Sequence, residues 1–360
     1  MPIFAEIVIS YPNKYPIHYK QDYFYWPAKM MMEKGFTVEF LTTEPGRNGE
    51  VHRGIVIKRF KGVLPLISYI NKSKDIELVH AHLRPYPPAL FSALSNKPKI
   101  LTPHTYILGS NPLIAAASVY LMKRFDRIVA LTSYEQEIYI KAGIPAAKIV
   151  VLPHPVDYQF YSSPAKNRAA VKKRLGISDE FVVVTVANCR KFKRIETLLR
   201  GFKLFNSSVK SKLVIVGEDL LWKEKARSIS DMVRQFGVNG VIQTGLLQPD
   251  KVREVLSVSD VFVNTSDNES MCLAVYEAAA AGLPLCLSDI GSFTQVFKDL
   301  AIYHTYWDYE KLAENILYYA RNRREAAEKG RKLKRFVRAW SFDAIRKRMA
   351  KLYGEVMAGK

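Results

Sequence analysis

Short apolar runs of β-strand composition alternate with helical stretches along most of the chain, and this alternation is the strongest constraint on its fold. The runs are continuous rather than alternating with polar residues, as in strands that are buried on both faces. Strands separated by helices build a parallel sheet covered on both sides. In the first half of the chain, strands are predicted at residues 3–9, 36–42, 55–60, 76–80, 100–102, 128–131 and 149–152.

A segment rich in proline and serine, residues 153–164, interrupts this pattern, which then resumes. A chain of 360 residues is also longer than most single cores. We therefore predict an α/β protein with two doubly wound, Rossmann-like domains, residues 1–155 and 156–340, whose ligands bind in a cleft between the sheets. Strands are predicted in the second half at 181–187, 213–216, 241–244, 261–264 and 283–287, and helices at 195–205, 222–236, 250–258 and 271–281.

The chain is strongly basic, with 54 Lys and Arg against 34 Asp and Glu and a net charge of +20. Residues 321–351 hold thirteen basic and three acidic side chains. This segment is interpreted as a solvated helical surface, with attachment to an anionic membrane surface as the alternative. We expect no specific nucleic-acid partner.

Other features of the sequence point to the cytoplasm. The three cysteines, Cys189, Cys272 and Cys286, lack the spacing of disulfide or metal motifs. The start of the chain does not resemble a signal peptide. Apolar runs also stay well below the roughly 18 residues of a membrane span. We expect a cytoplasmic protein that is at most peripheral on the inner face of a membrane.

Several enzyme classes are disfavoured because their motifs are absent from the sequence. There is no glycine-rich dinucleotide fingerprint and no P-loop, which argues against a simple nicotinamide dehydrogenase or a P-loop NTPase. There is also no Gly-x-Ser-x-Gly elbow of a serine hydrolase.

Residues 266–284 carry the most informative pattern. They follow an apolar strand and hold two carboxylates, Glu269 and Glu277, before a helix stop at Gly282 and Pro284. A helix that starts at the carboxyl end of a strand can hold an anion on its N–H groups. In a continuous helix the two acids would lie about 12 Å apart. Since paired glycosidase carboxylates lie about 5–10 Å apart, this spacing suits two contacts on one elongated ligand.

The run Ser266-x-x-Glu269-x7-Glu277-Ala278-x3-Gly282-x-Pro284 resembles the signature of the retaining glycosyltransferases of family 4, group 1, which have the GT-B fold. The resemblance is strong over residues 148–300 and weaker, though in register, in the first half. His154-Pro155 stands where the family usually has Asn-Gly. Trp340-Ser341-Phe342 resembles the motif before the final helix, which implies that residues 341–360 pack back on the first domain.

This resemblance implies a donor site for a nucleotide diphosphate sugar. Glu277 would bind the ribose hydroxyls and Glu269 the transferred sugar, since carboxylates accept hydrogen bonds from hydroxyl groups. The diphosphate would meet backbone N–H groups at the start of the helix. The remaining donor-binding residues expected from the resemblance are Ser266, Met271, Cys272, Leu273, Asn188, Gly245 and Leu247.

The basic loop 190–194 would stabilise the charge that develops on the leaving diphosphate. Lys193 falls on the position of the family's lysine, whereas the position of its arginine is Asn188. Arg190, two residues further on, is expected to supply this second charge. The alternative is a solvated basic turn.

Three histidines and one loop are the candidate site features of the predicted first domain. His80 and His82 lie at a strand end on one face, and the resemblance implies that His104 is a site residue near the donor sugar. A metal site built from these three is the weaker alternative, and His80 is expected to be structural. The loop 11–24 lacks the family's Gly-Gly pair, which indicates an unusual acceptor side.

The sequence thus predicts a hexosyltransferase that moves a sugar from a nucleotide diphosphate sugar to a hydroxyl of a carbohydrate or lipid-linked acceptor, with retention of configuration. Catalytic roles are expected for Glu269, Lys193, Arg190 and His104. No cofactor and no metal are expected, because no Asp-x-Asp motif is present. The alternatives are a nucleotide-sugar epimerase or other GT-B enzyme, and an inactive basic scaffold that binds polyanions.

Overall fold

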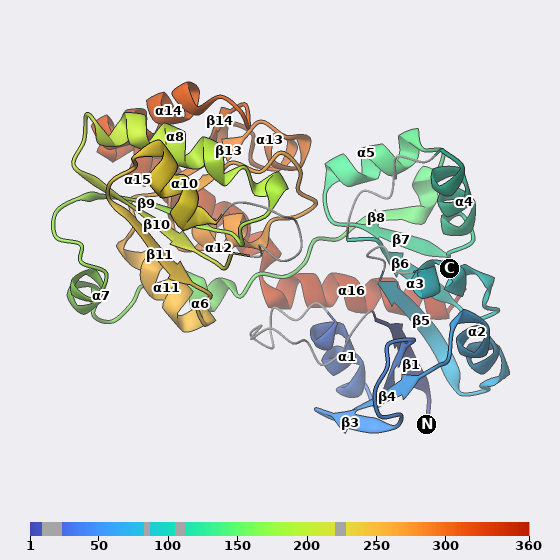
Figure 1. Ribbon diagram of the computed structural model, residues 1–360. Coiled ribbons are helices and arrows are strands. Elements are labelled where there is room, and N and C mark those ends of the chain that lie inside the picture. Colours follow the sequence, from blue (N-terminus) through green and yellow to red (C-terminus); the bar gives the residue numbers. More distant parts are fainter. Residues whose placement is uncertain (9–23, 83–86, 105–111, 220–227, 360) are drawn as a thin grey trace. The chain divides into compact units, whose positions relative to one another are not determined.

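The computed structural model describes residues 1–8, 24–82, 87–104, 112–219 and 228–359. The chain divides into two compact units (Figure 1). The first unit comprises Met1–Pro155 and Phe342–Lys360, and the second comprises Val156–Ser341. In the described residues, no helix combines the length and the apolar composition that a membrane span needs.

The first unit is built on an eight-stranded sheet with the order β3-β4-β2-β1-β5-β6-β7-β8. All neighbouring strands are parallel except β3, which pairs antiparallel with β4 and was not predicted because it is only three residues long and has no apolar run. The elements are β1 Ile3–Ile7, α1 Tyr25–Met32, β2 Thr37–Thr42, β3 Glu50–His52, β4 Ile55–Arg59, α2 Val63–Lys72, β5 Ile76–His82, α3 Pro87–Phe91, β6 Lys99–Thr102, α4 Pro112–Met122, β7 Arg127–Ala130, α5 Ser133–Lys141, β8 Ile149–Val151 and α16 Phe342–Met357.

The two faces of this sheet carry different side chains. Ala5 and Ile7 of β1 point into an apolar core shared with α2, α3, α4 and α5. The alternate residue Phe4 points to the opposite face, where its ring centre lies 5.2 Å from that of Tyr353 on α16. The final helix therefore covers one face of the first unit's sheet. Glu6 shares this face because strand residues alternate sides.

The second unit has a six-stranded, fully parallel sheet with the order β11-β10-β9-β12-β13-β14. The predicted helix at 222–236 is present from Ile229, and residues 220–227 lie outside the described part. The elements are α6 Tyr158–Ser162, α7 Arg168–Arg174, β9 Phe181–Val186, α8 Ile195–Asn206, β10 Ser211–Val216, α10 Ile229–Phe236, β11 Val241–Gly245, α11 Pro249–Val258, β12 Val261–Asn264, α12 Leu273–Ala280, β13 Leu285–Ser288, α13 Gly291–Phe297, β14 Ile302–His304, α14 Tyr309–Arg321 and α15 Arg323–Phe336, with short 3-10 turns at Ser92–Leu94, Ala146–Lys148, Lys191–Lys193, Lys298–Leu300 and Val337–Trp340.

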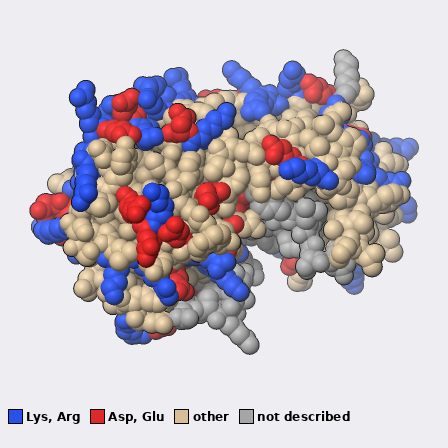
Figure 2. Space-filling model, turned by 90° about the horizontal axis from the view of Figure 1, so that it is seen from above, with Lys and Arg blue, Asp and Glu red and all other residues tan. Residues whose placement is uncertain are grey.

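The basic segment 321–351 is divided between the two units, because α15 belongs to the second and α16 to the first. On α15, Ala326, Gly330 and Leu333 are buried at helical spacing, and most of the basic residues face outward. Lys and Arg side chains recur over the face of the molecule drawn in Figure 2, interspersed with acidic ones. This distribution fits the interpretation of a solvated helical surface.

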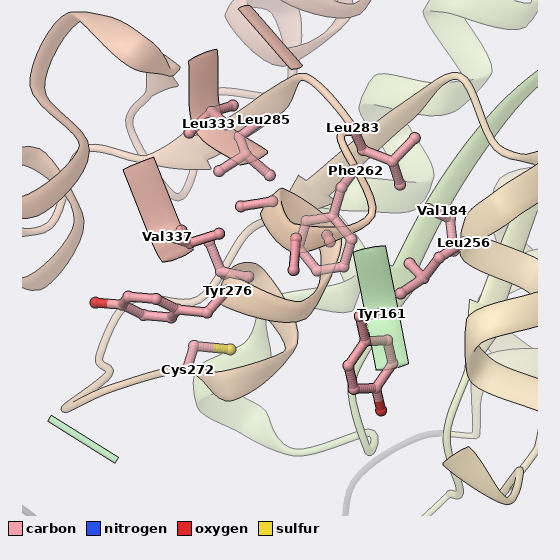
Figure 3. Packing of buried hydrophobic residues seen from close by; sticks show 14 of the residues in the cluster. Tyr161, Val184, Leu256, Phe262, Cys272, Tyr276, Leu283, Leu285, Leu333 and Val337 are labelled. Atoms are coloured by element: carbon pink, nitrogen blue, oxygen red, sulfur yellow. The ribbon is translucent and has the colours of Figure 1, made fainter. Parts of the chain in front are cut away.

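A large apolar cluster surrounds α12 in the second unit (Figure 3). Tyr276 of this helix is fully buried, and its ring centre lies 5.1 Å from that of Phe297 and 5.9 Å from that of Trp340. Val275 and the alanines at 278–280 are buried as well, so α12 is enclosed on nearly all sides. This packing fixes the helix that carries Glu277.

The predicted helix stop at Gly282 is confirmed. Gly282 has a φ of +83°, and the Leu283 N–H donates to the Ala278 carbonyl at 3.1 Å, which is a Schellman cap. Gly330 of α15 packs against this cap so closely that a Cβ there would lie 2.0 Å from the Gly282 carbonyl oxygen. The absence of a side chain at position 330 therefore allows the two backbones to meet.

We predict that Gly330→Ala destabilises the protein by at least about 2 kcal/mol, because the new methyl group meets backbone and not a flexible side chain. Gly354→Ala is the matched control, since Gly354 also lies within a helix but has open space around its Cβ direction. There the same change should stabilise by about 0.5–1 kcal/mol. Urea denaturation of both variants measures the difference, and equal effects would contradict the close packing.

Candidate functional site

The carboxyl ends of β9 and β12 define the candidate site of the second unit. These strands are neighbours in the sheet, although β10 and β11 come between them in the chain. The sheet grows from β9 in one direction and from β12 in the other, so this is the topological switch point where ligands bind in open α/β sheets. The loops after the two strands, residues 187–194 and 265–272, meet there.

Three contacts tie these two loops together. The Thr265 hydroxyl donates to the Lys193 carbonyl at 2.8 Å, and the Asp267 N–H donates to the Phe192 carbonyl at 2.8 Å. The Arg194 side chain pairs with Asp267 at 2.5 Å. The basic loop is therefore held against the acidic loop and is not a separate surface turn.

Lys193 and Glu269 form the central contact of the site. The Lys193 Nζ lies 2.5 Å from the Glu269 Oε1, and the Ser266 hydroxyl donates to the same oxygen at 2.8 Å. Both charged side chains are largely buried, with 13% and 11% of their surface exposed. Burial acts to lower the pKa of Lys193, but the charge of the Glu269 carboxylate and its hydrogen bond with the ammonium reverse this, so the pKa is raised. The ammonium is charged at neutral pH.

The helix after this loop begins later than predicted. α12 starts at Leu273, whereas the prediction began at residue 271, because Cys272 has an extended conformation with φ −81° and ψ +94°. Met271 and Cys272 thus lead into the helix, and Leu273 is its first residue. Glu269 lies outside the helix, so the 12 Å spacing to Glu277 along a continuous helix does not apply.

Two buried polar residues that the sequence analysis missed hold the acidic loop in place. The Asn264 Oδ1 accepts from the Ser266 N–H at 2.9 Å, and the Ser288 hydroxyl donates to the Ser266 carbonyl at 2.6 Å. Asn264 and Ser288 are the last residues of β12 and β13. Polar residues that end buried strands are the signal that could have identified them.

Glu277 lies inside α12 and is buried, with 8% of its surface exposed. Burial raises the pKa of its carboxyl to about 7; a hydrogen bond from Tyr161 acts in the opposite direction, and the negative charge of Asp157 adds to the rise. Asp157 and Tyr161 belong to the start of the second unit. Such a perturbed acid in a helix otherwise made of apolar residues is a functional-site candidate.

The remaining predicted residues of this unit lie at the same edge of the sheet. Arg190 precedes the 3-10 turn Lys191–Lys193, and its positive charge acts on Lys193. The Asn188 Oδ1 accepts from the Glu218 N–H at 3.0 Å, so Asn188 supports the loop after β10. Gly245, at the end of β11, has a φ of +68° and open space around its Cβ direction. Leu247, just beyond it, packs against the apolar cluster around α12.

The predicted histidines belong to the first unit. His80 is structural as expected, because its Nδ1 lies 2.7 Å from the Tyr353 hydroxyl and its Nε2 lies 2.8 Å from the Thr102 hydroxyl. His104 bonds His82 and His154 and has a φ of +61°, which is uncommon for a residue with a side chain. The loop 11–24 lies outside the described residues except for Phe24.

In the part of the chain that is described, one group of possible metal ligands is found, Glu6, His80 and His82. It differs from the set considered in the sequence, since Glu6 replaces His104. Both ring nitrogens of His80 already contact hydroxyl groups, so a metal would have to displace one of these contacts. The chemistry of the group fits hydrogen bonding better than metal ligation.

Comparisons with known proteins agree with this architecture. The family model "Glycosyltransferase Family 4" matches residues 28–160, and the model "Glycosyl transferases group 1" matches residues 167–338. The crystal structure of Anabaena HepE in complex with UDP superimposes with a TM-score of 0.81 at 16% identity, covering 99% of this chain and 100% of that one. This likeness extends over both units and shows a GT-B fold.

Two curated relatives are similar in sequence. N-acetyl-alpha-D-glucosaminyl L-malate synthase of Bacillus anthracis is 22% identical over 301 residues, which cover 75% of this chain and 76% of that protein. Alpha-monoglucosyldiacylglycerol synthase of Acholeplasma laidlawii is 26% identical over 259 residues, 64% of this chain and 63% of that protein. The two family models together match most of both units, and the fold is GT-B. The chain therefore belongs to glycosyltransferase family 4.

Proposed function

We propose that the protein transfers a hexose from a nucleotide diphosphate sugar to an acceptor hydroxyl with retention of configuration. The observation that carries this proposal is the arrangement of Lys193, Glu269 and Glu277 around the start of α12. The second unit is the donor domain and the first unit is the acceptor-side domain. The complex of the similar HepE protein with UDP supports a nucleotide as the ligand.

The donor extends along the start of α12 in this proposal. Glu277 accepts hydrogen bonds from the ribose hydroxyls, and the backbone of Met271–Leu273 meets the diphosphate at the positive end of the helix. Glu269 contacts the transferred sugar, with its carboxylate oriented by Ser266 and Lys193. Backbone groups of residues 245–247 at the end of β11 contact the base.

Lys193 stabilises the transition state electrostatically. As the bond to the sugar breaks, negative charge grows on the diphosphate oxygen, and a fixed, desolvated ammonium favours this charge. Arg190 supplies a second cation from the same loop. The departing oxygen leaves on the face from which the acceptor hydroxyl attacks, which retains the configuration. The two side chains carry the positive charge, so this proposal requires no metal or cofactor.

The acceptor is proposed to be a carbohydrate or a lipid-linked hydroxyl. The Acholeplasma relative, which is named for a diacylglycerol product, supports the lipid-linked option. A nucleotide-sugar epimerase remains the alternative enzyme, and it would turn over the donor with no acceptor present.

We predict that one class among UDP-, GDP- and ADP-sugars raises the melting temperature of the protein, because a ligand of the folded state stabilises it by mass action. Glu277→Gln should lower the affinity for that donor by about tenfold or more, since hydrogen bonds to a charged group contribute about 1.5–3 kcal/mol. Donor binding should also release a proton below pH 7. The ribose hydroxyls stabilise the carboxylate and lower a pKa that is about 7 in the free protein.

Calorimetric titrations from pH 6 to pH 8 test both effects. Affinity of the parent protein should rise with pH and level off above pH 7, whereas the Gln variant should be weak and independent of pH. Without ligand, the parent should lose about 2.5 kcal/mol of stability relative to the variant between pH 5 and pH 8. The raised pKa of the carboxyl makes its ionisation cost more in the folded than in the unfolded state over this range. Equal donor affinity of parent and variant would contradict the ribose role, and the absence of any donor would favour an inactive scaffold.

We predict that Lys193→Ala lowers kcat roughly 10²–10³-fold, the usual loss for one preorganised charge at a transition state. Release of the nucleoside diphosphate from the identified donor measures it. Lys191→Ala is the matched control, because Lys191 lies in the same loop but is exposed. Near-parent activity of both variants would show that the loop has no catalytic role.

A membrane surface is proposed as a further partner, through α4 of the first unit and not through residues 321–351. α4 has no acidic residue in its first turn, and Leu113 and Tyr120 are exposed by 82% and 63%. Helical spacing places these two along one side, and the guanidinium of Arg124, just beyond the end of α4, lies 5.7 Å from the Tyr120 ring centre. Apolar side chains beside basic ones on a chain of net charge +20 suit an anionic phospholipid bilayer.

We predict that the protein sediments with vesicles containing phosphatidylglycerol and not with pure phosphatidylcholine vesicles. Leu113→Asp should weaken this binding more than tenfold, because burial of one leucine contributes about 1.5–3 kcal/mol. Leu64→Asp is the control, since Leu64 on α2 is 81% exposed and should leave binding unchanged. Equal loss in both variants, or no binding of the parent, would remove α4 from the membrane contact.

A further inference from the structure

A pocket of about 450 Å³ borders the basic loop 190–194, and this volume is within the range of sites for small molecules. The described residues that line it come from the basic loop, the first two turns of α8, α10 and the segment around the start of α14. All of them belong to the second unit. Neither Glu269 nor Glu277 is among them, so the pocket is distinct from the candidate donor site.

The pocket lies on the face of the sheet opposite to α12. Residues of α8, α10 and α14 share an apolar core with Val183 of β9, whereas α12 shares one with Val182 and Val184. Adjacent residues of a strand point to opposite faces, so the two groups of helices cover opposite sides of the sheet. α8 and α14 pack side by side (Figure 1). The basic loop therefore borders both this pocket and the acidic loop that holds Glu269.

Positive charge is in excess in the described lining of the pocket. It contains four cations and one carboxylate, that of Glu196, and the cations are Arg190, Lys191, Arg194 and Arg200. Arg190 is half-buried and forms no hydrogen bond or ion pair with the described residues. The first turn of α8 also lines the pocket, so the positive end of the helix dipole adds to the field. This field favours an anionic ligand.

Arg200 is held in place by neighbouring side chains. Its guanidinium lies 4.9 Å from the Phe236 ring centre and 5.7 Å from that of Tyr309, and its Nη2 lies 2.7 Å from the Glu196 Oε1. A guanidinium has five N–H donors, and the ion pair occupies only one nitrogen. The side chain is 43% exposed, so the other donors are accessible to a ligand. Because the rings fix its position, little conformational entropy is lost when it binds an anion.

Arg194 reaches the pocket from a left-handed backbone conformation, with φ +48° and ψ +43°. Glycine adopts this conformation without strain, whereas a residue with a side chain does not. The Arg194 Nε lies 2.5 Å from the Asp267 Oδ2, and the guanidinium lies 5.4 Å from the Tyr306 ring centre. Its Nη atoms form no hydrogen bond with the described residues. Paired N–H donors of this kind match two oxygens of a phosphate group.

An exposed tryptophan gives the pocket an apolar wall. Trp307 is 63% exposed, and its ring packs edge-on against Tyr306 with ring centres 4.4 Å apart. An indole ring offers a large, rigid apolar surface to a ligand. A ligand that suits both the guanidinium groups and this ring carries a phosphate on a body with an apolar face. The C–H face of a sugar ring is such a surface, and the pocket has room for a sugar phosphate.

We propose that this pocket binds the phosphate monoester of a small sugar. The phosphate accepts hydrogen bonds from Arg194 and Arg200, and the sugar ring lies against Trp307. Arg190 and Lys191 add to the positive potential. The site goes beyond the proposed function, because it is a second ligand site, on the opposite face of the sheet from Glu277.

The test is NMR of the full chain labelled with ¹⁵N-tryptophan. The chain has four tryptophans, and Trp307→Phe assigns the Trp307 indole signal by its loss. In a titration with a panel of pentose and hexose monophosphates, at least one should shift this signal with a Kd below about 1 mM. Inorganic phosphate should bind about tenfold more weakly, because it lacks the sugar ring, and the unphosphorylated sugar should cause no shift. No shift with any member of the panel, or equal binding of inorganic phosphate, would overturn the assignment.

Variants locate the binding. Arg200→Gln should lower the affinity for the bound sugar phosphate about tenfold, since it removes charged hydrogen bonds. Arg234→Gln is the matched control, because Arg234 also pairs with an acid of its own helix, Asp231, but does not line the pocket. Glu277→Gln should leave the affinity unchanged. Equal losses in the two arginine variants, or a loss in Glu277→Gln, would place the ligand elsewhere and overturn the proposal. These measurements need no transferase activity, so they decide the pocket even if the proposed function fails.

Discussion

The order of strands in each parallel sheet is the constraint on which both clusters depend. In the second unit, the switch point between β9 and β12 brings Lys193 against Glu269, 76 residues further along the chain. The first unit has a corresponding switch point between β1 and β5, where Glu6 is the register partner of His80. Polar side chains collect at these places because loops diverge there, so no crossover helix covers the carboxyl ends of the strands.

Burial sets the chemistry of both clusters. A charge that is removed from water becomes costly unless a partner compensates it, and here the compensation is selective. Lys193 has a carboxylate in contact and remains charged, whereas Glu277 has mainly a hydroxyl and the negative Asp157 nearby, so its pKa rises to about 7. A buried acid with a raised pKa reduces the stability of the protein at neutral pH, and in the proposed function the hydroxyl groups of the donor recover part of this cost.

The sequence was sufficient for features that depend on local pattern. Strand β12 has the predicted bounds, and the stop at Gly282 follows from its left-handed backbone conformation. Features that depend on pairing across the chain were missed. β3 has no apolar pattern, the extended Cys272 delays α12, and Asn264 and Ser288 act only because β12 and β13 are adjacent. The contacts of His104 with His82 and His154 likewise join the end of β5 to segments that follow β6 and β8, and no spacing in the sequence indicates them.

His154-Pro155, the departure from the family's usual Asn-Gly, has a physical consequence for the contact between His154 and His104. A proline restricts the preceding residue to extended backbone conformations, so fewer conformations are lost when the His154 ring is held against His104. Asn-Gly would allow more backbone freedom and would offer an amide in place of an imidazole ring. The same two residues therefore supply both the ring that contacts His104 and the backbone restraint that keeps this ring in place. The positive φ of His104 is a costly backbone conformation, and the hydrogen bonds on both of its ring nitrogens offset this cost.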